Sequence, residues 1–178
     1  MKTLFGGWLA LALLGMGVYD AAAVDKIVIS SQKKPVSTTK VSAGGDGKKG
    51  ADKTAAVFEF KLQNQTLADL TQLTVNYILF VERQKLGARL DQPSPVDRIT
   101  GTQNIDVLSN RAPQSITTSE ITLNKQTMGG GWTYNNGGRL RAEDSVVGVW
   151  VRVLQGGEVI AEYANPPTVT KRGWDAAK

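Results

Sequence analysis

The chain has 178 residues, a formal net charge of +5 at pH 7, and neither Cys nor His. Without these residue types it cannot form disulfides, thiolate or imidazole metal sites, thiol nucleophiles or Ser–His triads. Its Lys and Arg residues are scattered, as on an ordinary solvated surface. Asp and Glu are also dispersed, with no spacing that indicates a facing carboxylate pair, and no nucleic-acid-binding motif is present. We therefore expect a protein that is not an enzyme, needs no cofactor or metal, and binds no nucleic acid.

The first 23 residues have the pattern of a secretory signal peptide. Lys2 gives a short positive region, residues 4–18 are almost entirely apolar, and residues 21–23 are three alanines that suit a signal peptidase. The apolar run of 15 residues is shorter than the roughly 20 that a membrane-spanning helix needs, so we favour cleavage over retention as an anchor. The pattern predicts export across the inner membrane of a bacterium, to the periplasm, the outer membrane or the cell surface.

The segments after residue 23 predict short strands separated by turns. Residues 25–31 contain an apolar run, and residues 36–43 alternate weakly between polar and apolar side chains. The glycine- and lysine-rich residues 44–50 predict a loop.

The apolar run Ile27, Val28 and Ile29 is a candidate edge strand for assembly. A strand of another subunit can pair with an exposed sheet edge and extend the sheet. The alternative is an ordinary first strand, because charged residues and proline nearby resemble those that guard edges against pairing. These guarding residues are Lys26, Lys33, Lys34 and Pro35.

The clearest strand signals lie at residues 58–63 and 73–82. Phe58, Phe60 and Leu62 alternate with polar residues, so their side chains share one face of a strand. Residues 73–82 alternate as well, and their second face is partly apolar, which indicates a central strand. The intervening residues 64–69 predict a turn.

Weaker signals fill the following part of the chain. Residues 84–97 contain Gly87, Pro93 and Pro95, which exclude a central strand and predict a loop. Residues 96–108 and 115–123 predict strands, and residues 128–138 predict a long glycine-rich loop.

A hairpin is predicted near the C-terminal end. Residues 146–154 are rich in β-branched side chains, Gly156-Gly157 indicates a tight turn, and residues 158–163 form the returning strand. This turn predicts Val153 opposite Ile160 and Trp150 opposite Tyr163. Pro166-Pro167 ends the returning strand, and Val169 starts a short last one.

The strand pattern predicts the fold class. After the leader, no stretch of ten or more residues shows a sustained helical period, and short strands alternate with turn signals. We therefore expect an all-β, immunoglobulin-like two-sheet β-sandwich of about seven to nine strands over residues 24–170. Residues 171–178 are predicted to form a flexible tail.

The glycine-rich segment is a candidate binding loop. Aromatic rings can stack on a sugar face, Asn side chains can bond hydroxyl groups, and Arg can bind sulfate, sialate or phosphate. The alternative is that Trp132 tucks under the loop as a core residue. The candidate residues are Trp132, Tyr134, Asn135, Asn136, Arg139 and Arg141.

Three segments also resemble a known family. The run 58–64, with Leu70 and residues 73–77, resembles the B–C strand region of small immunoglobulin-like proteins secreted by Verrucomicrobia, and residues 147–153 with Gly156-Gly157 resemble their closing hairpin. One such group, in Akkermansia, is associated with type IV pilus-like assembly. The resemblance implies an immunoglobulin-like fold and a structural role at a pilus or the outer membrane. A major type IV pilin keeps its apolar N-terminal helix after processing. Here the apolar run ends at the three alanines of residues 21–23, and a polar segment follows, so the chain does not resemble a major pilin.

These observations lead to one expected function and one alternative. We expect a secreted structural or adhesion-type component of a pilus-like or cell-envelope assembly, acting through protein–protein contacts with envelope proteins or with further copies of itself. The alternative is a module that binds mucin or polysaccharide glycans through the aromatic glycine-rich loop.

Overall fold

The computed structural model describes residues 26–41, 49–87, 93–128 and 141–175. The predicted signal peptide lies outside this part. Nine strands and one short 3₁₀ helix form within the described ranges. They are β1 (Ile27–Val41), β2 (Lys49–Asn64), β3 (Leu70–Glu82), β4 (Val96–Leu108), β5 (Gln114–Thr117), β6 (Ile121–Met128), β7 (Arg141–Glu143), β8 (Ser145–Gln155), β9 (Glu158–Asn165) and η1 (Pro167–Arg172).

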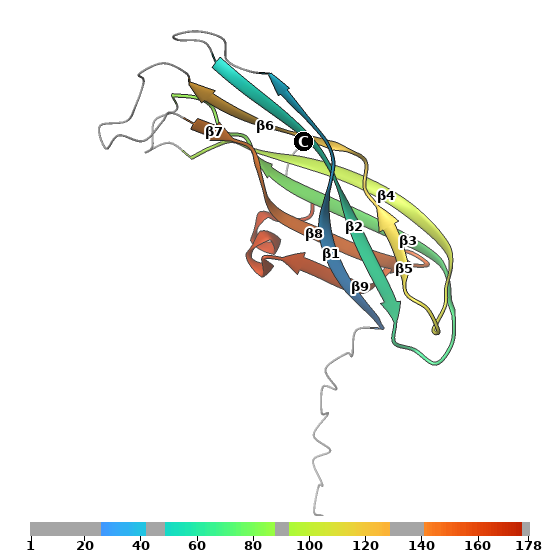
Figure 1. Ribbon diagram of the computed structural model, residues 1–178. Coiled ribbons are helices and arrows are strands. Elements are labelled where there is room, and N and C mark those ends of the chain that lie inside the picture. Colours follow the sequence, from blue (N-terminus) through green and yellow to red (C-terminus); the bar gives the residue numbers. More distant parts are fainter. Residues whose placement is uncertain (1–25, 42–48, 88–92, 129–140, 176–178) are drawn as a thin grey trace, which may run out of the picture.

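The strands form two antiparallel sheets that pack face to face (Figure 1). The first sheet has the order β1-β2-β6-β7, with β5 also paired to β2, and the second has the order β4-β3-β8-β9. Within these orders, β1-β2-β6 correspond to strands A-B-E and β4-β3-β8-β9 to strands C′-C-F-G of an immunoglobulin-like sandwich. The predicted all-β fold class is confirmed.

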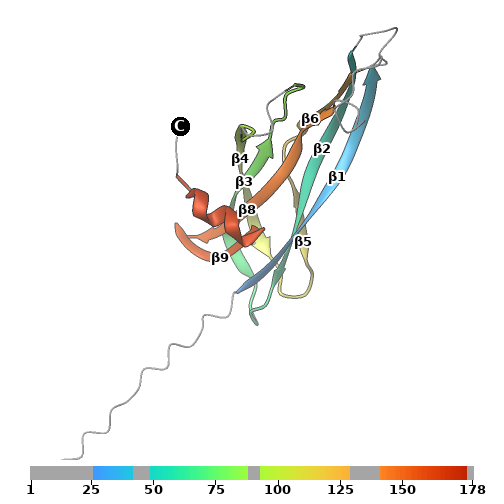
Figure 2. The same ribbon diagram turned by 90° about the vertical axis from the view of Figure 1, so that its left-hand side faces the viewer.

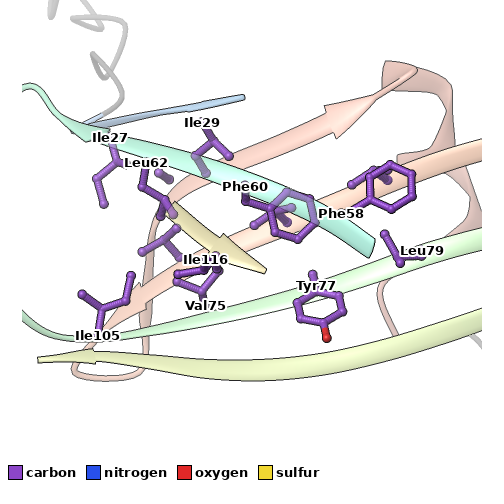
Figure 3. Packing of buried hydrophobic residues seen from close by; sticks show 14 of the residues in the cluster. Ile27, Ile29, Phe58, Phe60, Leu62, Val75, Tyr77, Leu79, Ile105 and Ile116 are labelled. Atoms are coloured by element: carbon purple, nitrogen blue, oxygen red, sulfur yellow. The ribbon is translucent and has the colours of Figure 1, made fainter. Parts of the chain in front are cut away.

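The core lies between the two sheets and is built by period-two alternation. Phe58, Phe60 and Leu62 of β2 point toward Val75, Tyr77 and Leu79 of β3 (Figure 3). The Phe60 and Tyr77 rings meet with their centroids 5.6 Å apart. The alternation predicted for both segments is therefore confirmed.

The first strand is longer than predicted. Residues 25–31 and 36–43 were expected to form separate segments, but β1 runs through Pro35. Pro35 is tolerated because β1 is an edge strand, in which a residue without a backbone N–H need not remove a hydrogen bond between two strands. The register with β2 shifts between Pro35 and Ser37, which absorbs the irregularity as a bulge.

The strand predicted over residues 115–123 is interrupted. Strands β5 and β6 pair with successive stretches of β2 on the same side. Between them, the Thr118 hydroxyl accepts a hydrogen bond from the Phe58 backbone N–H at 2.9 Å, and the Thr118 N–H bonds the Phe58 carbonyl. Thr118 thus satisfies the backbone of β2 where the ladder breaks.

The β8–β9 hairpin forms as predicted, but the predicted register of its two strands was wrong by one residue. Gly156 and Gly157 both have positive φ, as a tight hairpin turn of two glycines allows. Val153 lies opposite Ala161 and Leu154 opposite Val159, so Ile160 is an extra residue on β9. Trp150 therefore lies opposite Ala164, and Val151 opposite Tyr163. The slip turns Tyr163 inward, where its hydroxyl lies 3.1 Å from the Ser31 hydroxyl.

The end of the chain covers the outer face of the second sheet. Val169 belongs to η1 and not to a last strand, and it is buried against Ile78, Phe80 and Trp150. Figure 2 shows η1 on the side of the second sheet away from β1 and β2. Gly148 makes room for this contact, because a Cβ there would overlap the Val169 side chain.

The predicted tail is also shorter than expected. Trp174 packs edge-on against Trp150, with ring centroids 4.9 Å apart. The Arg98 guanidinium donates to the carbonyl oxygen of Gly173 at 3.0 Å and to that of Trp174. Residues up to Trp174 thus belong to the packed domain.

Tyr77 closes the side of the sandwich near β4. Its ring passes over Gly101 of β4, and its hydroxyl accepts a hydrogen bond of 3.2 Å from the Ser119 backbone N–H. A Cβ at position 101 would overlap the ring, so the crossing requires glycine.

We predict that Gly101→Ala lowers the free energy of unfolding by about 1–3 kcal/mol, because Tyr77 must shift away from Phe60 and Ser119. Urea denaturation of the purified chain measures this loss. Tyr77→Phe is the matched comparison: it keeps the ring and loses only the hydroxyl, at a cost of about 1 kcal/mol. A Gly101→Ala protein as stable as the parent would contradict the crossing.

Candidate assembly edge and candidate binding residues

Strand β1 forms one edge of the first sheet, because among the described strands it pairs with β2 alone. Ile27 and Ile29 point into the core and are 2% and 8% exposed, whereas Val28 on the other face is 51% exposed. The three residues predicted as an edge strand are therefore placed at a sheet edge. Whether another chain pairs with them stays a prediction.

The first part of β1, residues 27–32, is firmly held. Besides the two buried isoleucines, Ser31 meets Tyr163 of β9, and the Gln65 backbone N–H donates to the Lys26 carbonyl at 2.9 Å. This part contains neither a charged residue nor proline. Within residues 27–32, no charge or proline guards the backbone groups on the side away from β2, and Lys26 flanks them at the N-terminal end.

The second part of β1 is guarded. Residues 33–40 are all exposed, and they include Lys33, Lys34, Pro35 and the bulge. Charges, proline and bulges are the features by which sheets discourage pairing at an edge. The edge thus divides into a part that can accept a strand and a part that resists one.

An ion pair anchors the guarded part to the neighbouring strand. Lys34 pairs with Glu59 of β2. The hydrogen bond from Lys34, followed by one from Ser115, lowers the pKa of the Glu59 carboxyl. Glu59 is therefore a stable negative charge on the outer face of the first sheet.

A shallow polar groove of about 540 Å³ lies beside the unguarded part of β1. It lies on the first sheet and involves β1, β2 and β5. Its lining residues are Ser30, Ser31, Gln32, Glu59, Lys61 and Ser115. Hydroxyl, amide and charged groups of this kind suit polar side chains of an approaching strand.

A partly buried charge cluster holds one end of the sandwich together. Arg83, which follows β3, bonds Asp97 of β4 at 2.8 Å and Asp144 at 2.9 Å, and it donates to the Thr122 carbonyl. Asp144 also accepts bonds from the backbone and side chain of Asn124. The sequence showed Asp97 and Asp144 only as dispersed carboxylates. The fold brings both to one guanidinium, which positions strands and leaves neither carboxylate unpaired.

The cluster changes the acidity of its buried member. Burial raises the pKa of Asp144, but the hydrogen bonds from Asn124 and Arg83 outweigh it and hold that pKa below its usual value. The two carboxylates likewise outweigh burial and raise the pKa of Arg83. The pair is therefore charged under all ordinary conditions.

We predict a loss of stability in acid that depends on Asp144. Its folded-state pKa lies below the unfolded value of about 3.9, so its contribution is complete above that value and is lost as pH falls through the folded-state pKa. Asp144→Asn should cost about 1.5–3 kcal/mol at neutral pH and flatten the stability profile below pH 4. Urea denaturation at a series of pH values measures both effects. Parallel profiles for parent and variant below pH 4 would contradict the assignment.

The predicted binding loop is not assembled by the described residues. Trp132, Tyr134, Asn135, Asn136 and Arg139 lie outside the described part of the chain. Arg141 is described: it is exposed, starts β7 opposite Thr127, and lies 3.5 Å from the Glu143 carboxylate. Glycan binding by this loop therefore stays a prediction.

Over residues 26–41, 49–87, 93–128 and 141–175, no group of three or more Asp or Glu residues could hold a metal ion. In the same ranges, no helix has the length and apolar character needed to cross a membrane.

Comparison with known proteins gives limited similarity. No protein family matches the sequence, and no curated protein matches it. A solved structure of a protein from Akkermansia muciniphila is similar over 88% of this chain and 80% of that chain, with 10% sequence identity and a TM-score of 0.35. Its organism is one that the sequence resemblance named, but a similarity this low supports no conclusion about function.

Proposed function

We propose that this protein is a non-catalytic assembly module that joins a partner protein of the cell envelope by accepting a strand along β1. One observation carries the proposal: residues 27–32 form an edge that is held by the core and lacks charge and proline. Such an edge is a template for a strand of another chain.

Rigidity makes this edge suitable for pairing. Ile27 and Ile29 fix the backbone of β1 by their burial, so little conformational entropy is lost from this side when a strand docks. The main-chain bonds give affinity, and the alternating side chains of the incoming strand give specificity. On the outer face, those side chains would meet Gln32, Glu59 and Lys61 of the polar groove, which favours a polar partner strand.

The guarded part of the edge supports selectivity. Lys33, Lys34 and Pro35 limit pairing to the short first part of β1, so a long generic β-strand meets obstacles after residue 32. A partner of matched length avoids them. The signal-peptide pattern and the family resemblance favour an envelope protein, within a pilus-like assembly, as that partner.

A charge at the exposed position of the edge tests the proposal. Val28→Lys adds a guarding residue on an exposed side chain and leaves the buried isoleucines in place. Val107→Lys is the matched control, because Val107 is 52% exposed and lies on β4, an edge of the other sheet. A photo-crosslinking amino acid at the exposed Ser30 reports the partner in intact cells.

We predict that Val28→Lys reduces cross-linking to an envelope protein by about tenfold or more, a loss of about 1.4 kcal/mol in binding, and that Val107→Lys does not. Thermal unfolding of both purified variants confirms that they fold. Equal yields from the two variants, or no envelope protein trapped by the parent, would sink the proposal.

A further inference from the structure

A shallow groove of about 300 Å³ lies on the outer face of the second sheet, on the side of the sandwich opposite the first sheet. Residues of β3 and β4 form its floor, and the end of the chain forms its wall. Its lining residues include Asn76, Thr100, Thr102, Trp174 and Asp175. The proposed strand addition at β1 does not involve this surface.

The indole of Trp174 is fixed in place although it is only partly buried. It meets Trp150 edge-on at an interplanar angle of 85°. The guanidinium carbon of Arg152 lies 4.5 Å from the Trp174 ring centre and 4.9 Å from that of Trp150. Arg152 lies on β8, whereas the groove floor lies on β3 and β4. The ring is thus held from one side and lines the groove on the other.

The supporting residues are themselves fixed. Glu162 of β9 accepts a hydrogen bond of 2.8 Å from the Trp150 indole N–H and one of 2.7 Å from Arg152. Arg152 is therefore neutralised by a carboxylate while it packs on both indoles. A rigid aromatic wall of this kind loses little entropy when a ligand docks.

The floor of the groove carries hydrogen-bonding groups. Thr102 donates to the Asn76 Oδ1 atom at 2.8 Å, which orients the amide so that its nitrogen points elsewhere. Within the described part of the chain, the Asn76 amide nitrogen has no hydrogen-bond partner, so its two N–H groups are available to a ligand. The exposed hydroxyl of Thr100 adds a group that both donates and accepts.

The charge of the groove restricts the ligand. Asp175 is the charged residue among its lining residues, and nearby Arg152 is paired with Glu162. A second cation, Arg98, donates to the Gly173 and Trp174 carbonyls at the same wall. With a carboxylate and a guanidinium both beside it, the groove favours neither an anion nor a cation, and the carboxylate can accept hydrogen bonds from hydroxyl groups. The site thus suits a neutral ligand with one flat apolar face and several hydroxyl groups.

We propose that this groove binds a neutral pyranose sugar. The C–H face of the ring would pack on the Trp174 indole, and its hydroxyl groups would bond Asn76, Thr100 and Asp175. The volume corresponds to the small end of ligand sites, which suits the end of a glycan chain. Its lining residues are different from those of the predicted binding loop around Trp132.

The sheet provides a matched control for the floor. Thr74 and Asn104 form the same kind of hydroxyl–amide pair, at 3.3 Å, one row along the same two strands. That pair lies outside the groove lining. Asn76→Ala and Asn104→Ala therefore remove the same groups from the same face, but only the first removes a floor residue.

The test is a nitrogen–proton NMR titration of the full chain with two probes, cellotriose and triacetylchitotriose. The signal that disappears in Trp174→Phe identifies the Trp174 indole N–H. We expect at least one trisaccharide to shift this signal, Asn76→Ala to weaken binding by about fivefold or more, and Asn104→Ala to bind like the parent. Backbone spectra confirm that each variant folds.

Two results would overturn the inference. One is that neither trisaccharide shifts the Trp174 signal at any concentration up to about 10 mM, because the dissociation constant would then lie well above that concentration. The other is that Asn76→Ala binds as well as the parent. Because β1 is unchanged in every variant, neither result affects the proposed strand addition.

Discussion

The packing of two alternating apolar faces is the constraint on which the molecule depends. Without Cys, no disulfide can hold the sandwich, so the contact of Phe58, Phe60 and Leu62 with the inner face of β3 must do so. A one-residue slip of β2 would turn these side chains to solvent. The core therefore fixes the register of the central strands, and the edge strands take their positions from it. The firm hold on residues 27–32 is one consequence, because Ile27 and Ile29 are members of the same core.

The sequence predicts those parts of the fold in which burial follows a local period. Residues 58–63, 73–82 and 146–154 alternate or are densely apolar, and all became strands. Val169 was also predicted to start a strand, but it belongs to η1. The space above Gly148 and the outer-face residues Phe80 and Trp150 bury its side chain there. Tertiary packing overrode local propensity at that point. The hairpin register failed for a related reason, since the bulge at Ile160 leaves no mark in the alternation.

Some of the candidate sites could be predicted from the sequence, and others only the fold brings together. The edge position of Ile27, Val28 and Ile29 could be predicted, because an apolar run at the start of a sandwich domain commonly forms an outer strand. The Arg83 cluster could not, since Asp97 and Asp144 lie 14 and 61 residues away in sequence and only the fold joins them. The groove beside Trp174 was missed because its wall lies in a polar segment without strand signals. A single Trp in such a segment was the available hint, since exposing a large aromatic ring without a contact is unfavourable.

The two proposed surfaces are compatible because they extend the molecule in different directions. A strand added to β1 lengthens the first sheet within its own plane. The groove lies on the outer face of the second sheet, and the core separates that sheet from the first one, which contains β1. Figure 2 shows β1 and the second sheet on different sides of the sandwich. Coupling between distant sites needs an element with two discrete arrangements, and the central strands β2 and β3 are held in one register by burial. Occupation of the edge should therefore leave the groove both exposed and unchanged, so that an assembled protein would still present its aromatic wall to solvent.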